Sequence, residues 1–339
     1  MGVSAMILGV SGQAPTPDEL AFYRDCSPWG FILFRRNVDN PEQVRALTAA
    51  LRDNLGRNVP VFVDQEGGRV QRLGPPHWPK YPAGRTYGRI AANDPLTRRE
   101  LTRLGARLIA HDLLQLGIDG DCLPVVDVPV AGAHDVIGDR AYGQDPDTVA
   151  VLGRAAAEGL MAGGVLPVMK HMPGHGRAAV DSHLSLPVVD CTLADLESRD
   201  FMPFRMLADL PVAMTAHVVY TAIDARSPAT TSRTLLRRIV RGHIGFEGLL
   251  MSDDLSMQAL QGTLGERARG AMAAGCDIAL HCNGKMAEMI EVASEVPLLA
   301  GKARSRANAA LARIRHLPEP LDVGEARARL DAAVTALAA

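Results

Sequence analysis

The sequence predicts an α/β fold, a single (β/α)8 TIM-type barrel that fills residues 1–339 and ends in a helical tail from about residue 301. Eight short apolar segments alternate with longer amphipathic ones, which favours βαβ crossovers and a parallel sheet. Polar residues directly follow several of the apolar segments. An open doubly wound sheet is the alternative, but a closed barrel would bring all these polar residues to one face.

The expected strands are short apolar runs bounded by turn residues. They cover Ser4–Leu8, Gly30–Phe34, Pro60–Val63, Asp121–Val126, Val165–Met169, Val212–Ala216, Gly248–Met251 and Asp277–Leu280. The polar residues that follow them are Asp64, Asp127, Lys170, His171, His217 and Asp253. We therefore expect these side chains to converge at one mouth of the barrel.

Helices are expected between the strands, and three of them share a start signal. An Asn or Asp followed by proline is typical of an N-cap and the first helical position. The signal occurs at Asn40-Pro41, Asp94-Pro95 and Asp145-Pro146. Two shorter helices are expected over Thr234–Val240 and Glu266–Ala274, ended by Gly242 and Gly275. The arginines of the tail beyond residue 301 are interpreted as a solvated helix face.

Composition excludes several classes of function. The net charge of −2 gives no electrostatic case for binding nucleic acid or an anionic membrane. Five scattered cysteines in a chain of 339 residues indicate reduced thiols rather than a disulfide framework. No apolar run approaches the length of a membrane span. We expect a cytoplasmic monomer that binds neither nucleic acid nor membrane.

Two loops carry the residue types needed for catalysis. Residues 170–176 read KHMPGHG and are followed by Asp181-Ser182-His183, whereas a second apolar run ends in Ser252-Asp253-Asp254. In an extended segment Asp181 and His183 would point the same way, so the carboxylate could orient the imidazole for proton transfer. A loop ion pair is the alternative. Either Asp253 or Asp254 could be a nucleophile, and capping of the following helix is the alternative for each.

The same histidines also permit a metal site. His171, His175, Asp181 and His183 form a series that could hold Zn²⁺ in a metal-dependent hydrolase. The neighbouring Lys170 would repel a cation, and the sequence lacks HExxH and paired-cysteine motifs. The metal reading therefore remains an alternative.

A third passage suggests a sugar pocket. Residues 63–72 read VDQEGGRVQR, in which Asp64 could accept hydrogen bonds from vicinal hydroxyls. Arg72 and Arg140 could reach the same pocket, although each could equally form a structural ion pair. The sequence lacks GxxxxGK[ST], GxGxxG and GxSxG motifs, which argues against nucleotide-driven, Rossmann-type and serine-hydrolase chemistry. With only two tryptophans, a small pocket is favoured over a long sugar-stacking groove.

Taken together, KHMPGHG, DSH, SDDLSM, VDQEGGRVQR and IGDRAYG resemble the β-N-acetylhexosaminidases of the third glycoside hydrolase family. The resemblance is greatest to its cytoplasmic bacterial members of peptidoglycan recycling. It implies a retaining exo-β-N-acetylglucosaminidase acting on small sugar or muropeptide substrates, with no metal or organic cofactor. The family usually has phenylalanine in place of Met172, which we expect to cause only modest repacking.

The resemblance also implies roles for individual residues. Asp253 would be the nucleophile, His183 the general acid/base and Asp181 its partner. The terminal N-acetylglucosamine would be bound by Asp64, Arg72, Arg140, Lys170 and His171. Because a neutral imidazole would tolerate an anionic acceptor, phosphorolysis remains an alternative to hydrolysis. A catalytically silent carbohydrate-binding barrel is disfavoured, since binding alone needs neither Asp253 nor the Asp181–His183 pair. Pro173, Gly174 and Gly176 further suggest that His183 lies on a mobile loop that gates proton transfer.

Overall fold

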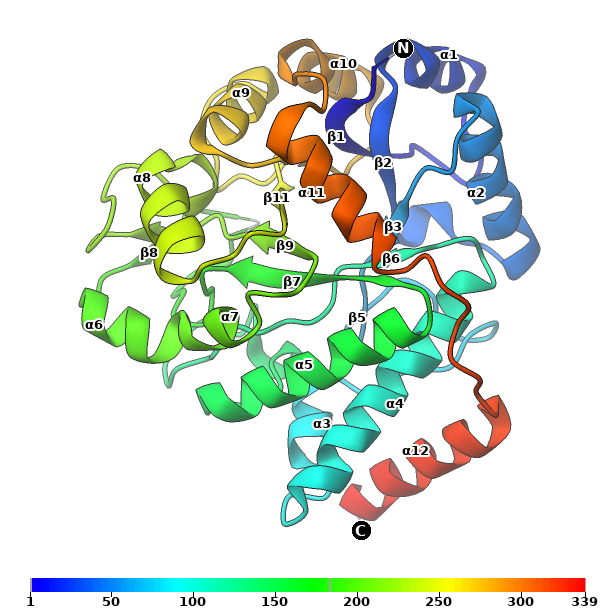
Figure 1. The fold of residues 1–339 in the computed structure, drawn as a ribbon, viewed down its shortest axis with the longest axis vertical. Helices are drawn as coiled ribbons and strands as arrows, with labels where there is room; N and C mark the ends of the chain where they lie inside the picture. Colours follow the sequence, from blue (N-terminus) through cyan, green and yellow to red (C-terminus); the bar gives the residue numbers. More distant parts are fainter. Residues whose placement is uncertain (1, 183, 339) are drawn as a thin grey trace.

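The computed structural model describes residues 2–182 and 184–338. Eight strands form a closed barrel in the order β1-β12-β11-β9-β7-β6-β3-β2, and every neighbouring pair is parallel. The strands are β1 (Ser4–Gly9), β2 (Pro28–Leu33), β3 (Val61–Val63), β6 (Gly120–Asp121), β7 (Leu166–Met172), β9 (Val212–Thr215), β11 (Leu249–Asp254) and β12 (Ile278–His281). The predicted barrel is confirmed, and each expected strand overlaps one of these (Figure 1).

Three strand boundaries differ from the prediction in ways that affect the polar residues. Strand β7 continues through Lys170 and His171, and β11 continues through Asp253 and Asp254. These side chains therefore lie on the last residues of strands rather than in loops. Strand β6 ends at Asp121 although the apolar run continues, because the proline at position 124 has no amide to donate to the ladder.

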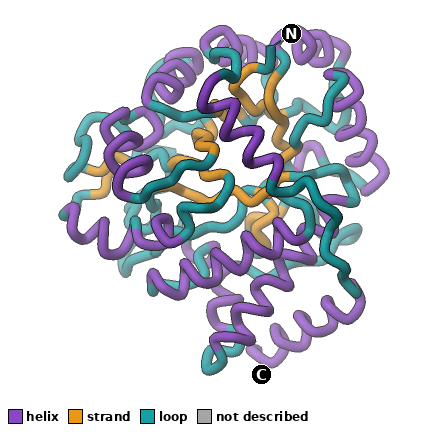
Figure 2. Tube along the Cα trace, in the orientation of Figure 1, coloured by secondary structure: helices purple, strands orange, loops and turns teal. Residues whose placement is uncertain are grey.

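Helices surround the barrel, as the tube view shows (Figure 2). They include α1 (Pro17–Cys26), α2 (Pro41–Leu55), α4 (Pro95–Leu114), α5 (Pro146–Ala162), α9 (Leu264–Ala274) and α10 (Met286–Glu295). The three predicted N-caps are confirmed: the side chains of Asn40, Asp94 and Asp145 each accept a hydrogen bond from the amide three residues on. Helices α1 and α10 had no counterpart in the sequence prediction.

Of the two shorter predicted helices, one ends where it was expected to end and the other does not. Helix α9 stops at Gly275 as expected. The helix expected over Thr234–Val240 begins as α8 (Arg233–Leu235) and continues in wider turns over Leu236–His243. The stop expected at Gly242 is therefore wrong, because the wider turns bond Ile244 N to Ile239 O and carry the helix past the glycine.

Two two-stranded sheets and several short helices are formed outside the barrel sheet. Strand β4 (Gln65–Gly67) pairs antiparallel with β5 (Val70–Gln71), and β8 (Val188–Val189) pairs parallel with β10 (Val219–Tyr220). Shorter helical pieces are α3 (Gly84–Arg89), α6 (Leu193–Asp195) and α7 (Met202–Met206). The β4–β5 hairpin needs glycine at its turn, where φ is +87° at Gly67 and +59° at Gly68.

The tail forms two helices, α11 (Gly301–Ala312) and α12 (Val323–Ala338). Figure 1 shows α12 beside α4, where Arg327 pairs with Asp112 at 2.7 Å. The prediction of a solvated arginine face is wrong for Arg306, whose guanidinium pairs with Glu247 and Asp277 at 3.1 Å each. These two ion pairs hold the Arg306 side chain against the barrel.

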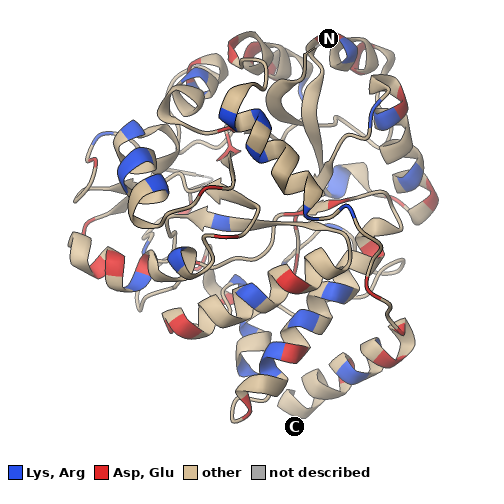
Figure 3. Cartoon of the chain, in the orientation of Figure 1, with Lys and Arg blue, Asp and Glu red and all other residues tan. Residues whose placement is uncertain are grey.

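Charges of both signs are interspersed over the outer helices, in keeping with the small net charge (Figure 3). Among the described residues, no helix combines the length and apolarity that crossing a bilayer would require. Trp29 and Trp78 are both buried, so neither offers an open stacking face to a sugar chain.

Candidate active site

A cavity of about 270 Å³ opens at the carboxyl ends of the barrel strands. Its polar lining residues are Asp64, Glu66, Arg72, Arg140, Lys170, His171, His175, Ser182, Asp253 and Asp254. They come from the β4–β5 hairpin and the residues at its two ends, from β7 and the loop after it, from β11, and from the segment before α5. The barrel thus brings together six of the eight site residues predicted from the sequence, although these six are spread over about two hundred positions of the chain: Asp64, Arg72, Arg140, Lys170, His171 and Asp253.

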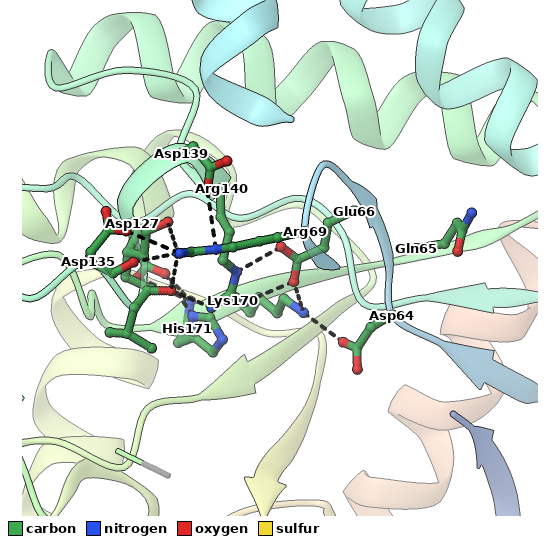
Figure 4. A network of polar contacts seen from close by, with 12 residues as sticks. Asp64, Gln65, Glu66, Arg69, Asp127, Asp135, Asp139, Arg140, Lys170 and His171 are labelled. Carbon is green, nitrogen blue, oxygen red and sulfur yellow. Dashed lines mark hydrogen bonds and ion pairs between the residues drawn. The ribbon is translucent and has the colours of Figure 1, made fainter. Parts of the chain in front are cut away.

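One wall of the cavity is a network of alternating charges (Figure 4). Lys170 Nζ lies 2.9 Å from Asp64 Oδ1 and 2.6 Å from Glu66 Oε1. Arg72 Nη2 donates to the other oxygen of Asp64 at 3.0 Å. Arg140 grips Glu66 through Nε and Nη2, both at 2.8 Å. These five side chains form a continuous network of charge-assisted hydrogen bonds along the cavity wall.

The charges in this network stabilise one another. Burial by itself would raise the pKa of Asp64, but the charges of Lys170 and Arg72 outweigh it and hold the pKa well below its usual range. Burial likewise opposes ionisation of Glu66, and Arg140 and Lys170 lower its pKa on balance. The pKa of Lys170 is raised, because its two carboxylates outweigh its burial. All three groups are therefore charged at neutral pH.

Glu66 belongs to this site, although sequence reasoning did not select it. It is 5% exposed and links Lys170 to Arg140. A signal was present: Asp64 and Glu66 are two residues apart in extended chain, so their side chains share a face. The sequence prediction selected only the first of the two.

Ion pairs join the β4–β5 hairpin to the segment that ends at Arg140, and each of the two segments contributes one arginine. Arg140 reaches the hairpin at Glu66, while Arg69 reaches back from the hairpin to Asp135 and Asp139, each at 3.2 Å (Figure 4). These ion pairs hold the two loops together over the cavity.

Asp127 organises the histidines of the KHMPGHG segment. Its carboxylate accepts from His171 Nδ1 at 2.7 Å and from the backbone amide of His175 at 2.7 Å. Burial opposes its ionisation, but His171 lowers the pKa of Asp127 on balance. The bond to Nδ1 fixes the ring of His171 at the cavity wall, where Nε2 is its remaining polar atom.

The end of β11 separates the two candidate nucleophiles. Both oxygens of Asp254 are engaged: Oδ1 accepts from the amides of Ser256 (3.0 Å) and Cys282 (3.1 Å), and Oδ2 from the Ser256 hydroxyl (2.6 Å). Asp253 Oδ1 accepts from the Asp254 amide at 2.8 Å, and its carboxylate lines the cavity. Asp254 therefore shapes the turn at the end of β11.

His217 forms a hydrogen bond with the backbone at the end of β11. Its Nε2 lies 2.9 Å from the Asp254 carbonyl oxygen, and its Nδ1 lies 2.7 Å from Thr230 Oγ1. The same hydroxyl bonds Thr215 Oγ1 at 2.8 Å, which in turn accepts from the Asp253 amide at 3.4 Å. Burial lowers the pKa of His217, so its role here is that of a neutral hydrogen-bonding group.

The expected acid/base pair is described only in part. His183 lies outside the described residues. Asp181 is partly exposed, and its carbonyl accepts from the amides of Leu184 and Ser185, both at 3.0 Å. The Asp181 carbonyl thus closes a turn, and the predicted pairing of Asp181 with His183 stays a prediction. Ser182, between the pair, is buried and lines the cavity.

The glycines after β7 lie close to neighbouring segments of the chain. A Cβ at Gly176 would lie 2.1 Å from the Val128 carbonyl oxygen, and one at Gly174 would lie 3.2 Å from Asp200. Residues 171–176 are all buried. These glycines permit close packing of this segment, and motion of the loop that carries His183 stays a prediction.

The metal alternative gains no support from the described residues. His171 Nδ1 bonds Asp127, and His175 Nε2 lies 3.0 Å from Ser182 Oγ. No cluster of three or more candidate ligands suited to a metal ion is present among residues 2–182 and 184–338.

Comparison with known proteins agrees with this geometry. The family model described as the glycosyl hydrolase family 3 N-terminal domain matches residues 27–317. The chain belongs to glycosyl hydrolase family 3. The resemblance to the β-N-acetylhexosaminidases of this family is thereby confirmed, and the protein is a glycoside hydrolase.

Individual relatives of the family 3 chain cover nearly its whole length. A beta-hexosaminidase of Alkalilimnicola ehrlichii is 39% identical, over 96% of this chain and 88% of its own length. The structure of NagZ from Neisseria gonorrhoeae in complex with N-trifluoroacetyl-D-glucosamine is 32% identical, with a TM-score of 0.85 over 100% of this chain and 98% of its own. A family 3 β-N-acetylglucosaminidase of Paenibacillus has a TM-score of 0.86 at 28% identity, over 97% and 67% of the two chains.

Proposed function

We propose that the protein is a retaining exo-β-N-acetylglucosaminidase. It removes terminal, non-reducing β-linked N-acetylglucosamine from peptidoglycan fragments such as GlcNAc-anhydro-MurNAc and its peptides. The observation that carries the proposal is the cavity in which Asp253 faces the wall of Asp64, Glu66, Arg72, Arg140 and Lys170. The structure of the relative from Neisseria gonorrhoeae is a complex with N-trifluoroacetyl-D-glucosamine, which supports this choice of sugar.

The reaction needs a nucleophile and a proton donor on opposite sides of the glycosidic bond. The Asp253 carboxylate bonds to the anomeric carbon as the bond to the leaving oxygen breaks, and His183 gives that oxygen its proton. His183, now neutral, takes a proton from water, whose oxygen displaces Asp253. Two displacements leave the β configuration unchanged. Asp181 orients His183 and favours its protonated form in the first step.

The wall residues position the sugar for this chemistry. The carboxylate of Asp64 accepts from hydroxyls, while Arg72, Lys170 and the ring of His171 offer donors. Arg140 acts mainly through Glu66, which it grips with two hydrogen bonds. Because the cavity is small and closed by the hairpin and its partner loop, it suits one terminal sugar rather than the middle of a chain.

The testing experiment is release of 4-nitrophenol from its β-N-acetylglucosaminide and, in parallel, from the β-glucoside. EDTA is included in one series, and phosphate is varied in another. The proposal predicts cleavage of the N-acetylated substrate alone, insensitive to EDTA, with N-acetylglucosamine as product. Loss of activity with EDTA would favour the metal-dependent hydrolase instead.

Phosphorolysis is the second outcome that the phosphate series distinguishes. A neutral imidazole lacks the charge with which a carboxylate base would repel phosphate. Formation of N-acetylglucosamine 1-phosphate, at a rate that rises with phosphate, would therefore identify a β-N-acetylglucosaminide phosphorylase. Free N-acetylglucosamine at every phosphate concentration would identify the hydrolase.

A further inference from the structure

A buried hydrogen bond joins the barrel to the loop that carries the proposed acid/base pair. His175 Nε2 lies 3.0 Å from Ser182 Oγ. The two residues are 2% and 3% exposed, and both line the cavity. Ser182 stands between Asp181 and His183 in the sequence, so the bond is made at the centre of the pair.

The histidine end of this bond is rigidly held. The His175 amide donates to Asp127 at 2.7 Å, and the Gly174 carbonyl accepts from the Tyr220 hydroxyl at 2.6 Å. On the other side, the Gly176 carbonyl accepts from the Val130 amide at 3.2 Å. His175 is therefore fixed to the carboxyl end of β7, from which Lys170 and His171 also reach the cavity.

The serine end belongs to a more exposed stretch. Ala179, Val180, Leu184 and Ser185 are all exposed, whereas Ser182 is buried. A polar side chain is buried inside an exposed loop only at a cost, which a hydrogen bond offsets. The bond to His175 supplies that compensation and draws the loop toward the cavity.

His175 is suited to holding the loop and unsuited to proton donation. Burial, together with repulsion by His171, lowers the pKa of His175 to about 4. The ring is therefore neutral over the range in which a histidine acid/base titrates, and its Nε2 is already engaged by Ser182.

We propose that the His175–Ser182 hydrogen bond is a positioning contact that holds the Asp181–His183 pair at the cavity for proton transfer. The inference rests on the proposed function, in which His183 is the acid/base. His175 and Ser182 themselves do not exchange protons with the substrate. Their loss therefore weakens acid/base assistance and leaves sugar binding and the nucleophile Asp253 in place.

The experiment compares Ser182→Ala with the wild type on two N-acetylglucosaminides. The 2,4-dinitrophenyl glycoside has a leaving group that needs no proton, and the 4-methoxyphenyl glycoside has one that does. Because acid/base assistance contributes roughly 10²–10⁴-fold, misplacing it should lower kcat/KM for the methoxyphenyl substrate by about 10–100-fold. kcat/KM for the dinitrophenyl substrate should change by less than about 3-fold, since its cleavage draws on almost none of that assistance.

A second readout separates positioning from general damage. With the dinitrophenyl substrate, turnover of Ser182→Ala should be limited by attack of water on the glycosyl–Asp253 intermediate. Azide attacks without a general base, so it should restore kcat and yield the β-glycosyl azide. Ser185→Ala is the matched control, because this exposed serine lies on the same turn and should behave as the wild type.

A double-mutant cycle with His175→Phe tests whether the two residues act as one unit. Each single variant should show the same dependence on the leaving group, and the double variant should be little worse than either. Equal losses with both leaving groups, or no azide rescue, would overturn the inference while leaving the hydrolase assignment intact. A wild-type chain that cleaves neither glycoside, or a His183→Ala variant without leaving-group dependence, would overturn the proposed function and the inference with it.

Discussion

At the scale of single residues, position along a strand determines which polar groups remain available for chemistry. Asp253 and Asp254 are neighbours at the end of β11, yet three donors engage the oxygens of Asp254. The same contrast holds between Asp64, whose charge is stabilised by Lys170 and Arg72, and Asp121, which is fully buried and whose Oδ1 accepts from the Gln65 amide. Their environments, rather than their chemical type, set their roles.

The contrast at β11 predicts different effects of two alanine substitutions. Asp253→Ala should lower kcat/KM by roughly 10⁴-fold or more and leave folding intact, because it removes the proposed nucleophile. Asp254→Ala should retain measurable activity but lower the free energy of unfolding by about 1–3 kcal/mol, because the Cys282 amide loses its acceptor. Kinetics and urea denaturation of both variants make the check. Equal and complete loss of activity in the two would contradict the assignment.

Asp121 predicts a pH dependence of stability. Burial raises the pKa of this carboxyl well above its usual range, so the folded state favours its protonated form. Its contribution to stability is therefore fully present below the unfolded pKa of about 4 and is lost as the pH rises toward the folded value. Asp121→Asn keeps an oxygen for the Gln65 amide, which Asp121 Oδ1 binds at 2.9 Å, and does not titrate.

Urea denaturation of wild type and Asp121→Asn between pH 4 and pH 8 tests this prediction. Relative to the variant, the wild type should lose stability steadily as the pH rises. A stability difference that stays constant across the range would show that Asp121 does not titrate differently in the folded state.

At the scale of elements, β7 and the segment after it position several of the side chains that line the cavity. Lys170 and His171 stand on the last residues of the strand, and His175 follows a tightly packed turn. The segment after the strand is closely packed, because Gly174 and Gly176 let the backbone approach Asp200 and Val128.

This packing predicts that Gly176→Ala is harmful. The added methyl group would lie 2.1 Å from the Val128 carbonyl oxygen, so the backbone must shift. We expect a loss of about 1–3 kcal/mol in the free energy of unfolding, together with reduced activity, because His175 moves. Gly12→Ala is the control, since nothing lies within 4 Å of a Cβ there. If Gly176→Ala matches this control in stability and activity, the close-packing argument fails.

At the scale of the whole molecule, the C-terminal helix is connected to the proposed sugar-binding wall. Arg327 of α12 binds Asp112 Oδ1 at 2.7 Å, and Tyr81 donates to the other oxygen of Asp112 at 2.7 Å. The Tyr81 carbonyl accepts from the Gly68 amide at 2.9 Å, at the turn of the β4–β5 hairpin. The tail thus supports the hairpin that presents Glu66.

Deletion of residues 323–339 should therefore affect both stability and substrate binding. Loss of the buried Leu330 and of the Arg327 pair should lower the free energy of unfolding by about 2–4 kcal/mol. KM should rise more than kcat falls, because the hairpin belongs to the binding wall. Arg329→Ala, which breaks only an exposed pair with Glu100, should cost less than about 1 kcal/mol. An unchanged KM in the shortened chain would show that the hairpin does not depend on the tail.

Local sequence patterns were enough to predict the barrel and most of the polar residues that line its cavity. Alternating apolar runs and repeated N-cap signals require only local propensities, and polar residues at strand ends must converge once a parallel barrel closes. The strands and three N-caps were therefore predictable, as was the gathering of Asp64, Lys170 and Asp253. The family motifs supplied their expected roles.

The partner of each of these groups, by contrast, depends on how distant segments pack together. Glu66 became part of the wall because Arg140 and Lys170, distant in sequence, meet it there. The bond between His175 and Ser182 and the close packing of Gly176 likewise depend on the path of the chain after β7. Such contacts are set by distances between segments that no local pattern encodes, so sequence alone could name the groups but not their arrangement.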